Sequence, residues 1–285
     1  MSQFFDKAEV RSIALNDEPY PFEGLYVYPI TVKQYGMFLA CESALSVRLS
    51  MLPAVYAARN YANALFAMQI DSILHGNEEG QQLLWSMFMN LLLMALRIPF
   101  NMAQQAVKMY VNPKDNTDLQ ALVITQTTDI DGEVMVRLTP SKVGLLRELI
   151  ALMNGVELPD EADNPELIQA EQDIRQMNQA FDLDINVDDM KATVAMNQGM
   201  RMRDLDNWSI LEFNLIKQAI DRDKHFMVYG IGEASGMVKY KNGNPVPSLF
   251  FNKKQESLAV ISANAFQQRV SGAIQSVDSL PNLPI

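Results

Sequence analysis

Residues 83–96, with the sequence LLWSMFMNLLLMAL, form the most apolar stretch of this 285-residue chain. Two polar residues, Ser86 and Asn90, interrupt the stretch, and Arg97 and Pro99 follow it. A membrane-spanning helix needs about 20 apolar residues, whereas this stretch has fourteen residues. We therefore expect a helix that is buried in the core of a soluble protein.

Helices are also predicted on both sides of this stretch. Thr31 and Gln34 have the spacing of a capping box, and the helix that they start has an apolar face made of Tyr35, Phe38, Cys41, Leu45 and Leu49. A second helix should run from about Pro53 to Ile73, a third from Glu79 to Ile98 around the apolar stretch, and a fourth from about Asn101 to Val107.

A change of pattern at Met109 indicates a small β element. Residues 119–128 are rich in β-branched side chains, Asp131-Gly132 favours a hairpin turn, and residues 134–138 alternate as a strand does. We expect two or three antiparallel strands, inserted among the helices at about 109–138.

Helical patterns return after the β element. Thr139-Pro140 should start a helix that ends at Asn154-Gly155 and has Val143, Leu146, Ile150 and Met153 on its apolar face. Another helix is expected at 188–197, with Gly199 as its stop signal. A third is expected from Trp208 to Ile220, with Ser209 and Glu212 as a capping pair, whereas residues 226–231 suit either a strand or a helix.

Residues 156–190 form an acidic segment that accounts for almost the whole charge imbalance of the chain. The segment holds eleven acidic residues and one basic residue, Arg175, so its formal charge is −10 of the −11 of the whole protein. Within it, residues 165–181 predict an amphipathic helix with one apolar stripe: Leu167, Ala170, Ile174, Met177 and Phe181. This stripe either docks on the protein's own core or binds a partner, and the sequence leaves both open.

Together these patterns predict a mainly α, multi-helical fold with a small antiparallel β-hairpin element. We expect five parts: an irregular N-terminal arm at 1–24, with Pro19 and Pro21 as breakers; a helical domain at 25–155 that contains the β insertion; the acidic segment at 156–190; a second helical unit at 191–251; and a weakly helical, mobile tail at 252–285.

The composition favours a protein-binding role in the cytoplasm. A net charge of −11 disfavours binding to nucleic acid, whose phosphates are neutralised by Lys and Arg, and it disfavours docking on an anionic membrane surface. Cys41 is the single cysteine, so no intramolecular disulfide can form, which suits a reducing compartment. Its spacing with Tyr35, Phe38 and Leu45 predicts a buried, unreactive thiol.

Patterns for a reaction centre or a metal site are weak in this sequence. His75 and His225 each lack a second metal ligand at helical spacing, and residues 182–193 match a calcium-binding loop only in their first half. We therefore predict no catalytic residue, no cofactor and no metal ligand. An active site assembled from residues distant in sequence remains an alternative, because sequence patterns do not reveal such sites.

One motif suggests DNA binding. Val194-Ala195, Gly199 and Leu205 are spaced much as in a helix-turn-helix unit. The helix that would enter the major groove contains Asp204, Asp206 and Glu212 against two arginines, whereas such helices present basic residues to the phosphates. A plain helical hairpin is the favoured interpretation, and a DNA-binding regulator is kept as an alternative.

Methionine is frequent in this chain, at eighteen residues. Most of these side chains should fill the core, but methionine also adapts to varied apolar partners, so a surface that accepts many amphipathic helices would use it. The candidate partner-binding residues are Met87, Met94 and Met102, together with Leu167, Ile174, Met177 and Phe181 of the apolar stripe.

Four stretches resemble a family of proteins from long-tailed phages of Gram-positive bacteria. They are YPITVKQY at 28–35, LRELIALMNGVELPD at 146–160, residues 202–213, and EASGMV at 233–238. The family is that of the tail assembly chaperones, which are encoded near the tape-measure protein. The resemblance covers residues 25–250 except for the β insertion, and none of its motifs is catalytic.

The resemblance implies a helical, acidic, non-enzymatic protein of phage morphogenesis, located in the cytoplasm of the infected host. Such a protein would coat the apolar helices of the tape-measure protein while the tail tube assembles. The implied partners are the tape-measure protein and, as a second candidate, the tail tube protein, with several copies of this chain on one client. A structural virion component of the tail or neck is the main alternative.

Overall fold

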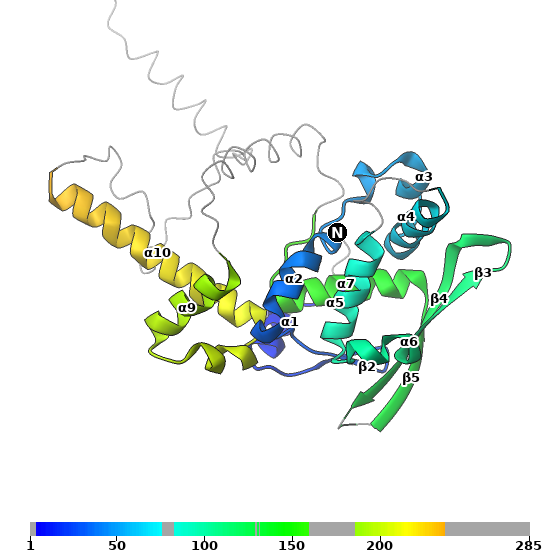
Figure 1. Cartoon of the computed structure of the whole chain (residues 1–285), viewed down its shortest axis with the longest axis horizontal. Coiled ribbons are helices and arrows are strands. Elements are labelled where there is room, and N and C mark those ends of the chain that lie inside the picture. Colours follow the sequence, from blue (N-terminus) through cyan, green and yellow to red (C-terminus); the bar gives the residue numbers. More distant parts are fainter. Residues whose placement is uncertain (1–3, 76–82, 129, 131, 160–185, 237–285) are drawn as a thin grey trace, which may run out of the picture. The chain divides into compact units, whose positions relative to one another are not determined.

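A computed structural model of the chain describes residues 4–75, 83–128, 130, 132–159 and 186–236 (Figure 1). The described residues form a mainly α-helical protein with two small antiparallel sheets, which confirms the predicted fold class. The chain divides into two compact units, residues 1–220 and residues 221–285. This boundary falls inside the expected unit 191–251, because residues 191–220 belong to the first compact unit.

Helix α5 (Leu83–Ala95) is part of the hydrophobic core of the first unit. Its side chains Phe88, Leu91 and Leu92 are fully buried. Helices α2 (Tyr35–Cys41), α4 (Tyr61–His75) and α7 (Pro140–Asn154) pack against it. The expectation of a buried helix at this stretch is confirmed. Each such side chain contributes about 1.5–3 kcal/mol when it leaves water, so α5 and its neighbours supply much of the driving force for folding.

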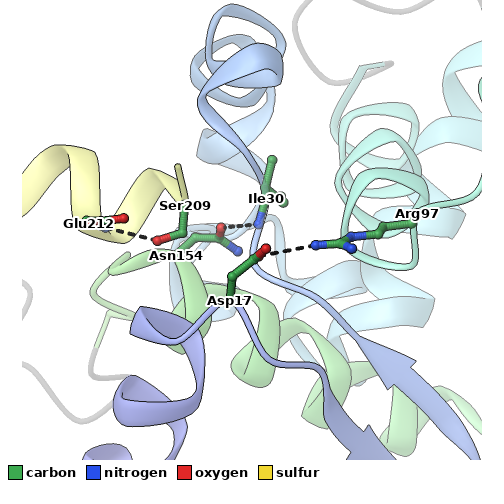
Figure 2. Close-up of polar contacts among 6 residues, drawn as sticks. All are labelled: Asp17, Ile30, Arg97, Asn154, Ser209 and Glu212. Carbon is green, nitrogen blue, oxygen red and sulfur yellow. Dashed lines mark hydrogen bonds and ion pairs between the residues drawn. The ribbon is translucent and has the colours of Figure 1, made fainter. Parts of the chain in front are cut away.

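The C-terminal end of α5 is fixed by a turn rather than by a longer helix. Arg97 adopts a left-handed conformation with φ of 54°, and its guanidinium lies 3.2 Å from Asp17 Oδ1 (Figure 2) and 4.1 Å from the ring centre of Tyr28.

In the described part of the chain, no single helix is long and apolar enough to cross a membrane. The pieces 84–95 and 100–106 pass that test of length and composition together, but they are bent by 114°.

The first 24 residues contain regular structure where the sequence predicted an irregular arm. Asp6 caps α1 (Lys7–Leu15) by accepting a hydrogen bond from the Ala8 N–H, and α1 packs against α7. Strand β1 (Tyr20–Phe22) then pairs with β2 (Leu25–Val27), and Gly24 forms the turn with φ of 90°. Pro21 is tolerated because both strands of a two-stranded sheet are edge strands. The prediction was wrong because it treated the two prolines as breakers only.

Residues 25–32 form a central segment in which Leu25, Val27, Ile30 and Val32 are buried. Leu25 and Val27 pair with β1, and several other backbone groups of this segment pair with residues far along the chain. The Gln126 side chain accepts a hydrogen bond from the Tyr26 N–H at 2.9 Å and donates one to the Tyr26 carbonyl at 2.8 Å. The Tyr28 N–H donates to the carbonyl of Ala95 at 2.7 Å, at the end of α5.

Asn154, the last residue of α7, holds the next part of the central segment. Its Oδ1 accepts a hydrogen bond from the Ile30 N–H at 2.9 Å (Figure 2), and its Nδ2 donates to the Ile150 carbonyl at 2.7 Å. Gly155 follows with φ of 74° and ends α7 as predicted. Asn154 is 1% exposed. Its side-chain amide therefore takes the place of water as the hydrogen-bond acceptor for the buried Ile30 N–H.

The two helices predicted between Thr31 and Ile73 are interrupted. A short 3₁₀ turn, η1 (Val32–Gln34), precedes α2, and two more, η2 (Glu42–Ala44) and η3 (Leu49–Met51), follow it. The second helix is split into α3 (Ala54–Ala57) and α4. Thr31 makes no capping hydrogen bond through its side chain, so the expected capping box is not formed. Its backbone instead forms an isolated bridge with Ser209.

Arg147 of α7 explains one of these interruptions. Its guanidinium donates hydrogen bonds to the carbonyls of Leu45 and Val47, at 2.8 and 2.9 Å, just after η2. The same guanidinium lies 4.1 Å from the ring centre of Tyr61, and the Tyr61 hydroxyl donates to the Ala44 carbonyl. Side chains of α4 and α7 thus satisfy carbonyls that a continuous helix would have paired internally.

The β insertion is a three-stranded antiparallel sheet in the order β3-β4-β5, which confirms the expected element. It follows η4 (Phe100–Met102) and α6 (Ala103–Ala106), and its strands are β3 (Val107–Asn112), β4 (Asp115–Thr128) and β5 (Gly132–Leu138). One face of the sheet, with Leu122, Ile124 and Leu138, is buried in the core. The other residues of the same strands, which alternate with these, point to the opposite face, which we call the outer face of the sheet.

The last described elements are helical. Asn186 caps α9 (Val187–Gln198), and Gly199 ends it with φ of 66°, as predicted. After η5 (Met202–Asn207), helix α10 (Ile210–Ala234) begins with the Ser209 hydroxyl accepting a hydrogen bond from the Glu212 N–H (Figure 2). Residues 226–231 therefore belong to a helix. The predicted amphipathic helix at 165–181 and the tail at 252–285 lie outside the described residues.

The Asn154 junction gives a first prediction. Asn154→Ala removes the acceptor for the Ile30 N–H inside the core, and an unpaired buried group costs about 1–3 kcal/mol. We expect the free energy of unfolding in urea to fall by that amount. Asn207→Ala, at an exposed asparagine, is the matched control and should change stability by less than about 0.5 kcal/mol. Equal stability of the two variants would contradict this role of Asn154.

Candidate partner-binding surface

The three described candidate methionines lie in different environments. Met94 is 2% exposed and belongs to the core. Met87 is partly buried and packs against the core, and its sulfur accepts a weak hydrogen bond from the Ser43 hydroxyl. Met102 is 43% exposed. Leu167, Ile174, Met177 and Phe181 lie outside the described residues. Of the described candidates, therefore, Met102 is the one that is well exposed to a partner.

A larger exposed apolar surface follows Met102 along the chain. We define the apolar segment 100–111 by five exposed side chains on η4 and β3: Phe100, Met102, Met109, Tyr110 and Val111. Each of them is between 36% and 49% exposed. Sequence patterns missed Met109 and Tyr110. Successive residues of a strand point to opposite faces of the sheet, so Tyr110, opposite Ala121, lies on the outer face, whereas Met109, opposite Leu122, lies on the face that packs on the core.

The strand register extends this surface across the sheet. Tyr110 of β3 lies opposite Ala121, Lys108 lies opposite Val123, and Val123 in turn lies opposite Arg137 of β5. The Arg137 guanidinium is 5.6 Å from the ring centre of Tyr110, so the two side chains share the outer face of the sheet. Met135, on the same face by alternation, is 70% exposed. This face combines apolar side chains with the cationic Lys108 and Arg137 and the acidic Glu133.

The second compact unit has an apolar surface of its own. Within α10, Met227, Val228 and Ile231 are between 51% and 68% exposed, and Phe226 is 43% exposed. These residues are those for which the sequence left strand and helix open. His225 is exposed and its Nδ1 lies 3.5 Å from Asp221 Oδ2 one turn earlier. Exposed apolar side chains that are grouped in this way mark an interaction surface.

A polar cluster joins α2 to the first half of α10. The buried Tyr35 donates a hydrogen bond from its hydroxyl to Asn214 Oδ1 at 2.9 Å, and Lys217 Nζ donates to the same hydroxyl at 3.3 Å. Burial raises the pKa of the neighbouring Glu42 carboxyl, and the charge of Lys217 opposes that rise in part. The Tyr35 ring also packs edge-on against Phe213 at 5.2 Å. These contacts fasten the first half of α10, which belongs to the first unit, to the core.

The other candidates for chemistry are the Cys41 thiol and the side chains of a metal site. Cys41 is buried, as predicted, and burial raises the pKa of its thiol. Such a shift keeps the thiol in its unreactive protonated form at neutral pH. Among the described residues, no group of three or more His, Cys, Asp or Glu side chains is arranged to hold a metal ion. Residues 182–185 of the partial calcium motif lie outside the described residues.

The segment with helix-turn-helix spacing differs from both interpretations of its sequence. After α9 and Gly199, residues 202–207 form the 3₁₀ helix η5, and α10 begins only at Ile210. The residues that would have formed one recognition helix are therefore divided between two elements. Trp208 and Ser209, at the point of division, pair with the central segment at Val32 and Thr31. The expected plain hairpin also omitted η5.

Comparisons of the chain with protein-family models, with curated proteins and with solved structures gave no match.

The polar cluster gives a second prediction. The raised pKa of Glu42 belongs to the folded state, so the ionised carboxylate lowers stability as the pH rises from the ordinary carboxyl pKa through the raised one. We expect Glu42→Gln to be more stable than the wild type at neutral pH. The difference in stability between the two proteins should disappear below the ordinary carboxyl pKa, near pH 4. There, Glu42 is protonated in both the folded and the unfolded wild type.

Urea unfolding across this pH range measures the effect. Glu18→Gln, at an exposed glutamate before β1, is the control and should follow the wild type. A Glu42→Gln protein that is less stable than the wild type at neutral pH would show that attraction to Lys217 outweighs the cost of burial.

Proposed function

We propose that this protein is a phage tail assembly chaperone that coats the apolar helices of the tape-measure protein during tail tube assembly. One observation supports this proposal most. Of the twenty large apolar side chains that are exposed in the described residues, eight are methionines. They are Met37, Met51, Met102, Met109, Met135, Met196, Met202 and Met227.

Methionine at exposed positions suits a client that varies along its length. Its side chain is unbranched and its thioether is polarisable, so it adapts to apolar surfaces of different shape. A tape-measure protein, as a long amphipathic helix, would offer many such surfaces in sequence and would need temporary cover for each. Promiscuous helix-binding proteins use methionine-rich surfaces in the same way. Several shallow contacts per copy would also allow release when the tail tube assembles.

The charge of the chain supports the same role. A net charge of −11 keeps a protein with exposed apolar surface soluble, because like charges oppose association. The outer face of the β sheet differs from this average, since Lys108 and Arg137 flank Val123 there. An amphipathic client helix with acidic flanks would therefore meet apolar and cationic groups together on that face.

The proposal predicts a defect for the apolar segment 100–111. The double variant Met102→Ser and Met109→Ser should weaken binding to the co-expressed tape-measure protein by at least about tenfold, because each methionine that a client buries contributes about 1.5–3 kcal/mol. Thermal stability should change little, because both side chains are exposed. The measurement is pull-down of a tagged tape-measure protein, followed by titration with one of its helical fragments.

The double variant Val55→Ser and Ile73→Ser is the matched control, because both apolar side chains are well exposed, at 67% and 66%, lie outside segment 100–111 and are not among the eight exposed methionines. If the test variant and the control lose binding equally, or if neither loses it, the client binds outside segment 100–111. The client proposal itself fails if the wild-type chain neither binds the tape-measure protein nor keeps it soluble. A stoichiometric amount of this chain in purified virions would favour the alternative, a structural component of the tail or neck.

A further inference from the structure

Strand β5 is one edge of the three-stranded sheet in the described part of the chain. It pairs with β4 from Gly132 to Leu138, and β4 pairs on its other side with β3. Half of the backbone N–H and C=O groups of β5 therefore point away from β4. An edge with such groups is a template for a further strand.

The two edges of this sheet are not equivalent. The pairing of β3 with β4 has register shifts between Tyr110 and Val111 and between Val111 and Asn112, which mark a bulge or irregularity. The pairing of β5 with β4 runs from Leu138 to Gly132 without any shift. Bulges twist an edge and disfavour pairing with another strand. β5 also contains no proline, so its edge suits the addition of a strand better than that of β3.

The side chains of β5 identify what would pair with it. Glu133, Met135 and Arg137 are exposed on the outer face, and Glu133 and Arg137 each lie two residues from Met135. In an antiparallel pair of two identical β5 strands related by a twofold axis at Met135, each Glu133 lies opposite Arg137 of the other copy. Val134 then lies opposite Val136. Opposite charges in directly facing positions stabilise a pair of strands.

We propose that β5 is a self-association strand, through which two copies of this chain form a dimer with one continuous six-stranded sheet. The occupant of the β5 edge is a second copy because the strand is complementary to itself in charge and apolar pattern. In such a dimer the outer faces of the two sheets, with Met135 at the twofold axis, form one surface. The proposal is independent of the client, since it concerns the chain alone.

The arrangement of Arg137 in the isolated chain is compatible with this pairing. Its guanidinium lies over the Tyr110 ring at 5.6 Å, a contact on the exposed outer face. The guanidinium is on a flexible side chain, so it can turn from Tyr110 toward Glu133 of a second copy without moving the strand. The dimer therefore exchanges one exposed contact of each arginine for a facing ion pair.

A charge exchange tests the proposal. Sedimentation velocity of the full-length protein should show a dimer for the wild type. Arg137→Glu and Glu133→Arg should each raise the dissociation constant by about tenfold or more, because each places like charges opposite each other twice in a symmetric dimer. The double variant Glu133→Arg and Arg137→Glu should restore dimerisation. Lys108→Glu, on the outer face but on β3, is the control and should remain dimeric.

A cross-linking measurement checks the register separately. Met135→Cys should form a disulfide-linked dimer on mild oxidation, because facing residues of paired strands have Cβ atoms about 4.5–5.5 Å apart. Cys41 should not interfere because it is buried. Lys108→Cys should stay unlinked. A monomeric wild type, a dimer that survives the single charge reversals, or cross-linking through Lys108→Cys instead would each overturn the proposal. None of these outcomes depends on whether the tape-measure protein binds.

Discussion

The need to pair the backbone of the central segment, residues 25–32, governs much of this fold. The segment is buried, so each N–H and C=O that leaves water needs a partner inside the protein. The partners come from the end of α5, from β4, from the end of α7 and from the start of α10. Elements that are far apart in the sequence are therefore held around one extended segment. The apolar packing of α5 completes this arrangement rather than determining it alone.

Sequence patterns predicted the elements whose signals are local. The glycines after α7 and α9 marked helix ends correctly, and the alternation before Leu138 marked a strand, because caps and alternation act within a few residues. The N-terminal arm was predicted wrongly although the cap of its helix, at Asp6, is a local signal. The helices between Thr31 and Ile73 were also predicted wrongly. There, distant side chains such as Arg147 decide the outcome by pairing with backbone carbonyls. No local pattern contains that information.

The same limit applies to the candidate surface. Helical spacing and composition singled out Met87 and Met94, but they do not distinguish a core-facing from a solvent-facing position on a helix that is apolar on all sides. Tyr110 and Met135, which share the outer face of the sheet, were within reach of the alternation rule once strands were assigned, whereas Met109 shares the face of the buried Leu122. A functional surface of this kind is defined by what the core leaves uncovered, so it can be read only after the core has been assigned.

The backbone pairing of residues 30–32 with residues 208–210, in which the Ile210 N–H donates a hydrogen bond to the Ile30 carbonyl at 2.8 Å, has a consequence for the time course of synthesis. A ribosome adds about 5–20 residues per second, so the 180 residues between these two partners take roughly 10–40 s to emerge. During that interval the central segment and the apolar helix α5 have already been synthesised. The start of α10, which pairs with the central segment, has not. The nascent chain thus lacks these backbone partners for most of its synthesis. The final fold can form only after most of the protein has been translated.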